Sequence, residues 1–62
     1  MVINHSSDLT PGVFVINEKR IEWGIGQVQS KIGNIITVNF ENAGKKTING
    51  KEIKLNIVKN EI

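Results

Sequence analysis

The chain has 62 residues, with eight Lys and Arg against six Asp and Glu, and it has no cysteine. This length allows one domain with a thin core, because a domain of this size buries only about 60% of the surface of its unfolded chain. Without cysteine, disulfides and thiolate metal sites are excluded. His5 is the only histidine, which excludes a histidine-rich metal site and a conventional catalytic triad. We therefore expect no metal and no cofactor.

The first residues show neither a basic stretch nor an apolar stretch typical of a signal peptide. No run approaches the roughly 20 apolar residues of a membrane span. The sequence therefore predicts a cytoplasmic protein with no membrane contact. The net charge of +2 is spread along the chain, and the only adjacent basic pairs are Lys19-Arg20 and Lys45-Lys46. A dedicated electrostatic nucleic-acid binder would carry more positive charge.

Residues 1–9 show no periodicity, and we interpret them as a flexible arm. A turn at 10–12 leads into a short apolar strand at 13–16, and the polar stretch 17–22 predicts a loop. Residues 24–32 and 35–41 alternate in polarity around Gly33-Asn34, the pattern of a β-hairpin. In this hairpin we expect Gly26, Val28, Ser30 and Ile32 on one face. We expect Ile36, Val38 and Phe40 to point inward from the second strand.

The last third of the chain predicts two more strands. A turn at 42–44 precedes a short charged strand at 45–48, which suits a sheet edge. A turn at 49–50 precedes a closing strand at 53–58. Helical periodicity is absent from every window. Five short strands joined by tight turns favour a small all-β barrel of the SH3-like or Tudor-like type over residues 10–62. Glycines at the predicted bends are Gly12, Gly24, Gly26, Gly33, Gly44 and Gly50.

Several side chains are candidates for contact with a partner. Trp23 follows the polar loop, where it can plug one end of a small core or present an exposed anchor. Phe14 and Ile16 share the strand face opposite Val13 and Val15, so they are covered either by the arm or by a partner. The basic residues Lys19, Arg20, Lys45 and Lys46 are either solvated or face an acidic or phosphate-bearing partner.

No residue set indicates catalysis. Gly24 and Gly26 do not form a phosphate-binding loop, because neither of the usual glycine-rich motifs is present. Glu18 and Glu22 lie in the polar loop, and the sequence predicts no apolar pocket around them of the kind that acid–base catalysis needs. We therefore expect a protein that is not an enzyme and has no small-molecule substrate.

Three segments resemble a family of small bacterial domains of uncharacterised function. These segments are PGVFVIN, EWGIGQVQS and NIITVNFENAGKKTI. The family pattern is G-D-x-V-x-H, then W-G-x-G-x-V-x-S, then N-F-E-x-A-G-K. The outline is also similar to the Tudor-like tail of UvrD-type helicases. More loosely, it resembles the RNA-polymerase-interacting domain shared by CarD and the transcription-repair coupling factor. Val13 replaces the acidic residue of the pattern and Asn17 replaces its histidine, so contacts through those side chains are not carried over.

The resemblance implies an SH3-like barrel that binds the β subunit of RNA polymerase, as the relatives' interacting domains do. We therefore expect a non-catalytic module that docks on RNA polymerase or on an associated transcription or repair protein. Two alternatives stay open: a weak nucleic-acid-binding barrel, and a structural module that assembles with copies of itself through Phe14 and Ile16. Fold alone does not choose among these partners.

Overall fold

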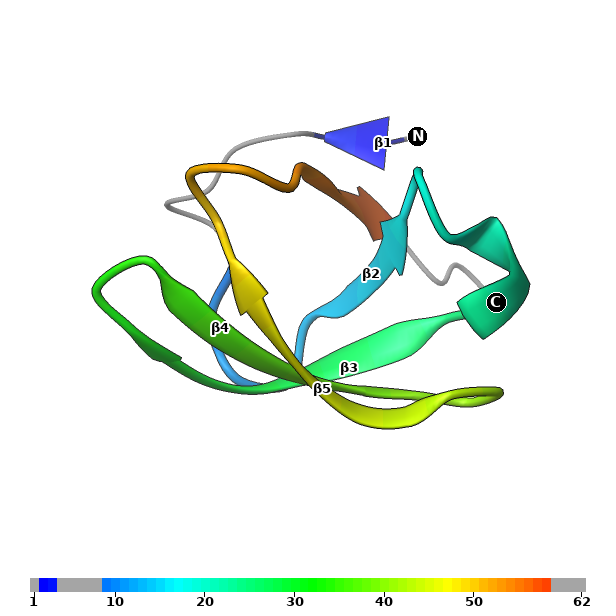
Figure 1. Cartoon of the computed structure of the whole chain (residues 1–62). Helices are drawn as coiled ribbons and strands as arrows, with labels where there is room; N and C mark the ends of the chain where they lie inside the picture. Colours follow the sequence, from blue (N-terminus) through cyan, green and yellow to red (C-terminus); the bar gives the residue numbers. More distant parts are fainter. Residues whose placement is uncertain (1, 4–8, 59–62) are drawn as a thin grey trace.

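The protein is built from β-strands. The computed structural model describes residues 2–3 and 9–58 (Figure 1). The described part contains one 3-10 helix, η2 (Ile21–Trp23), and no α-helix. Its strands are β1 (Val2–Ile3), β2 (Phe14–Asn17), β3 (Gly26–Ile32), β4 (Ile35–Phe40), β5 (Gly44–Asn49) and β6 (Leu55–Val58). The prediction of an all-β domain is confirmed, and β2 to β6 are the five strands that the sequence predicts.

All strands belong to one antiparallel sheet in the order β1-β6-β2-β3-β4-β5. The sheet curls around one interior, with β2 and β6 on one side and β4 and β5 on the other (Figure 1). Among the described strands, no ladder joins β5 to β1 or β6, so the curled sheet keeps free edges. Within the described residues, β5 is therefore paired on one side only.

A bulge in β3 changes the face on which its last residues lie. Val28 pairs with Val38, but the next pair is Ser30 with Thr37, so Gln29 is an extra residue. Alternation predicts Ser30 and Ile32 on the same face as Gly26 and Val28, and this prediction is wrong for both. Beyond the bulge the two faces exchange, and Ile32 is 78% exposed at the tip of the β3–β4 hairpin.

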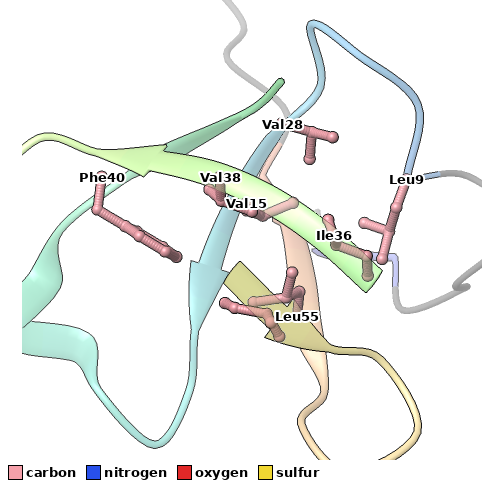
Figure 2. Packing of buried hydrophobic residues seen from close by; sticks show 8 residues of the cluster. Leu9, Val15, Val28, Ile36, Val38, Phe40 and Leu55 are labelled. Atoms are coloured by element: carbon pink, nitrogen blue, oxygen red, sulfur yellow. The ribbon is translucent and has the colours of Figure 1, made fainter. Parts of the chain in front are cut away.

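The core lies inside the curl of the sheet (Figure 2). The predicted inward face of β4 is confirmed, because Ile36, Val38 and Phe40 are all buried. Val13, Trp23, Ala43, Ile53 and Ile57 pack against the core from its margins. The buried apolar residues are Leu9, Val15, Val28, Ile36, Val38, Phe40, Ile48 and Leu55.

The segment before Thr10 contributes to this domain. The sequence predicts residues 1–9 as an arm outside the barrel, yet Leu9 is a core residue with only 3% of its surface exposed. Val2–Ile3 forms β1, which pairs with Ile57 and Val58 of β6. The remainder of the predicted arm, residues 1 and 4–8, lies outside the described residues, as do residues 59–62. The domain therefore begins no later than Leu9.

Candidate functional site

Trp23 ends η2 and lies at one end of the core. Its ring packs at 5.1 Å, centroid to centroid, from the Phe40 ring, with 59° between the ring planes. The Lys46 Nζ lies 5.2 Å from the centroid of the Trp23 ring, within the range of a cation–π contact. The indole is half-buried. Trp23 therefore closes one end of the core, and the Lys46 side chain lies over its ring.

Backbone hydrogen bonds join the W-G-I-G segment to the end of β4. The Asn42 N–H donates to the Trp23 carbonyl (3.0 Å), and the Glu41 N–H donates to the Ile25 carbonyl (2.9 Å). In return, the Ile25 N–H donates to the Glu41 carboxylate at Oε2 (3.0 Å). The two sequence motifs W-G-x-G and N-F-E-x-A-G thus form one rigid corner.

The glycines of this corner permit close approach. At Gly24, where φ is +79°, an added Cβ would lie 2.5 Å from Glu41 Cγ. At Gly26, it would lie 2.5 Å from Val38 Cγ1 and 2.6 Å from Phe40 Cδ1. Gly26 is the first residue of β3 and does not lie in a turn, although the sequence predicts a bend there. A side chain at Gly26 would push the core apart, and one at Gly24 would displace the Glu41 and Asn42 side chains and strain the backbone, so both glycines have a structural role.

Beside this corner, the outer face of the sheet is hollowed. Phe14 pairs with Gln27, and Gln27 pairs with Asn39, so these side chains form one row across β2, β3 and β4. Phe14 and Ile25 are 38% and 41% exposed. We call this feature the outer-face hollow; its volume is about 380 Å³, and it is lined by Phe14, Ile25, Gln27, Asn39, Glu41 and Val58.

The structure separates the two lysines that the sequence predicts as a pair. Lys45 pairs with Asn39 and is exposed on the outer face, next to the hollow. Lys46 pairs with the buried Val38 and lies over Trp23 on the inner side. Because neighbouring residues of a strand point to opposite faces, the two charges do not form one basic strip.

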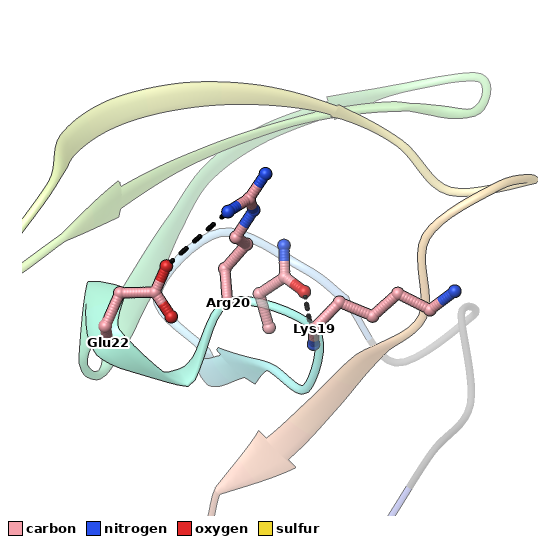
Figure 3. A network of polar contacts seen from close by, with 4 residues as sticks. Lys19, Arg20 and Glu22 are labelled. Atoms are coloured by element: carbon pink, nitrogen blue, oxygen red, sulfur yellow. Dashed lines mark hydrogen bonds and ion pairs between the residues drawn. The ribbon is translucent and has the colours of Figure 1, made fainter.

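Lys19 and Arg20 lie in the loop between β2 and η2 (Figure 3). The Lys19 N–H donates to Oδ1 of the buried Asn17 (3.0 Å), which shapes the start of the loop. Arg20 Nη1 lies 3.7 Å from Glu22 Oε2, and both side chains are more than half exposed. Figure 3 shows the Lys19 side chain directed away from this ion pair. The loop therefore offers two separate cations, one of them already paired.

Five residues of the outer-face hollow are absent from the predicted contact residues. Alternation predicts that Gln27, Asn39 and Glu41 point outward, and this pattern could have identified them as surface residues of the sheet. Ile25 and Val58 gave no such signal, because their exposure depends on the corner at Trp23 and on the pairing of β6. Of the predicted contact residues, the structure brings Trp23 together with Lys46, and it places Phe14 in the hollow.

The described residues contain no group of three or more His, Asp or Glu side chains placed to hold a metal ion. No helix in the described part is long and apolar enough to cross a membrane. All buried side-chain nitrogens and oxygens of this part have a hydrogen-bond partner.

Comparison with known proteins identifies the family. Neither the curated proteins nor the solved structures gave a match. A family model matches residues 9–58, a range that begins at the core residue Leu9 and ends with β6. It includes both motifs of the Trp23 corner and all residues of the outer-face hollow. The chain therefore belongs to the DUF3553 family, a family of proteins of unknown function.

Proposed function

We propose that this domain is a non-catalytic binding module that docks on another protein through the outer-face hollow. The observation that carries this proposal is the meeting of Phe14 and Ile25, two large apolar side chains about 40% exposed, in one hollow. Aromatic side chains in pockets are the usual anchors of protein interfaces. The polar residues Gln27, Asn39 and Glu41 around them match the polar surroundings of such anchors.

The edge of β5 that no described strand pairs with extends this docking surface. β5 ends the strand order and lies beside the hollow, because Lys45 is the cross-strand neighbour of Asn39. An extended segment of a partner can add to such an edge through main-chain hydrogen bonds. Lys45 would then steer an acidic stretch of the partner toward the edge, since exposed charges act mainly on the association rate.

We propose RNA polymerase, through its β subunit, or an associated transcription or repair protein as the partner. The support is the loose resemblance of the G-x-x-V strand followed by G-x-G to the interacting domain of CarD and of the transcription-repair coupling factor. The Tudor-like tail of UvrD-type helicases shares the same outline. The structure adds that the shared corner holds Ile25 at the rim of the hollow.

Nucleic-acid binding is the competing function. It would use Lys45, Lys46 and the loop cations, but Lys45 and Lys46 lie on opposite faces of β5, and Arg20 is paired with Glu22. Self-assembly through Phe14 and Ile16 would use the same strand as protein docking, and a concentration-dependent mass in solution would reveal it.

The test is the affinity of the full chain for purified bacterial RNA polymerase core enzyme. Phe14→Ser should weaken binding by roughly thirtyfold, because the loss of an anchor side chain typically lowers the affinity of an interface by this factor. Ile32→Ser serves as the matched control, because Ile32 is an exposed apolar residue at the hairpin tip, outside the hollow. Ile32→Ser should bind like the wild type. Equal affinities of all three proteins would contradict docking through the hollow, and no binding by the wild type would contradict the choice of partner.

A further inference from the structure

We propose that the outer-face hollow receives an arginine side chain of the partner protein. This inference rests on the proposed docking function and names the chemistry of the contact. It follows from three properties of the hollow: a carboxylate that forms no ion pair within the described residues, an exposed aromatic ring, and amide oxygens that can accept hydrogen bonds.

Among the described residues, Glu41 is the only charged one that lines the hollow. Its Oε2 accepts a hydrogen bond from the Ile25 N–H, which fixes the side chain beside the hollow. Among the described residues, Glu41 forms no ion pair, since the one salt bridge found there joins Arg20 and Glu22. The hollow therefore presents a positioned negative charge, which selects for a cation.

Phe14 and Ile25 supply the surface against which such a cation packs. A guanidinium group stacks on an aromatic face, and the methylene groups that precede it cover apolar surface. A lysine ammonium is a compact and strongly hydrated charge that stacks less well. The combination of Phe14, Ile25 and Glu41 thus favours arginine over lysine.

The amide side chains complete this match. Gln27 Nε2 donates to the Gly12 carbonyl (3.4 Å), so its Oε1 is the atom left for a ligand. Asn39 stands next to Gln27 in the same row and is exposed. A guanidinium has five N–H donors and no acceptor, so it can use these oxygens together with the carboxylate. Lys45, outside the hollow, places a positive charge near Asn39; the partner's arginine is therefore expected to have an acidic neighbour.

The experiment is a titration of the isotope-labelled full chain with N-acetyl-arginine methylamide, followed by NMR. The amide signal of Ile25 is the main readout, because its N–H is bonded to Glu41. We expect saturable shifts at Ile25, Gln27 and Glu41. The citrulline analogue, which has the same shape without the charge, should bind about tenfold more weakly, as expected for loss of a charge-assisted contact. The lysine analogue should also bind more weakly than the arginine compound.

Variants locate the contact. Glu41→Gln removes the charge but keeps an oxygen for the Ile25 N–H, and it should weaken binding of the arginine compound about tenfold. Glu52→Gln makes the same charge change in the β5–β6 loop, at the opposite end of β5, and should have no effect. Phe14→Leu should weaken binding roughly threefold by removing the aromatic face.

The outcomes separate this inference from the proposed function. An arginine response no stronger than that of citrulline or lysine, or shifts away from the hollow, would overturn the arginine assignment. If Phe14→Ser abolishes polymerase binding while the arginine compound causes no shifts, docking stands and the arginine inference fails. If the arginine compound binds as expected while polymerase does not, the inference stands and the proposed partner is wrong.

Discussion

Val38 is a core position at which a charged side chain should unfold the domain. Its side chain has no exposed surface and lies at the centre of β4. Val38→Asp buries a carboxylate without a partner, which costs several kcal/mol, whereas a domain of this size has roughly 3–5 kcal/mol of stability. We expect this variant to be unfolded by circular dichroism.

Ile32→Asp is the control, because Ile32 is 78% exposed on the neighbouring strand. It should melt cooperatively near the wild-type temperature. A folded Val38→Asp variant would show that the inward face of β4 is wrongly assigned.

Gly26 is a second position where one carbon atom matters. An added Cβ would meet both Val38 and Phe40 at less than 3 Å, and overpacking of this kind typically costs about 1–3 kcal/mol. Gly33→Ala is the matched substitution, since Gly33 has φ of +59° and open space around it. Gly33→Ala should therefore lower the unfolding free energy only by the cost of a left-handed backbone at a non-glycine residue, about 1 kcal/mol.

Urea denaturation should therefore give Gly26→Ala the larger loss of unfolding free energy. A smaller loss for Gly26→Ala than for Gly33→Ala would contradict the close packing of the corner.

At the scale of elements, the Trp23 corner joins η2 to the β4–β5 hairpin. Trp23→Ala removes a ring that packs on Phe40 and supports Lys46, and we expect a loss of about 2 kcal/mol or more in unfolding free energy. Trp23→Phe keeps an aromatic ring and should retain most of the stability. Equal stabilities of the wild type and Trp23→Ala in a chemical melt would show that the ring is not part of the core.

The segment that precedes β2 also belongs to the domain. Leu9 is 3% exposed, so Leu9→Ala should lower the unfolding free energy by about 2–5 kcal/mol. Leu9→Met, which conserves volume, should cost less than about 1.5 kcal/mol. Both values come from urea denaturation of the full chain. A Leu9→Ala variant as stable as the wild type would show that Leu9 is not a core residue and belongs to the arm that the sequence predicts.

Most of the strands could be predicted from the sequence, but two local features could not. Alternation identified the inward face of β4, because Ile36, Val38 and Phe40 keep an unbroken period. The bulge at Gln29 does not change the alternation of polar and apolar residues, so the sequence does not predict the exposure of Ile32. η2 was missed because three residues are too few to show a helical period.

At the scale of the whole molecule, the candidate site could be predicted only in part. Phe14 was identified because its strand is apolar on both faces. Ile25 and Glu41 were not, because their proximity depends on hydrogen bonds between segments 16 residues apart in sequence. Lys45 and Lys46 are adjacent in sequence, whereas the pleat of β5 places them on opposite faces. Sequence adjacency in a strand therefore misleads about surface adjacency.

The most direct test of protein docking is the salt dependence of binding to RNA polymerase core enzyme, measured for the wild type, Phe14→Ser and Lys45→Glu/Lys46→Glu. We predict a shallow dependence on salt, a large loss of affinity for Phe14→Ser, and a lysine variant that mainly associates more slowly. Each phosphate contact would instead add a slope of roughly −0.7 to −0.9 to log K against log salt. A slope equivalent to several phosphates, with a Phe14→Ser variant that binds normally and a lysine variant that does not, would contradict protein docking and indicate a nucleic acid.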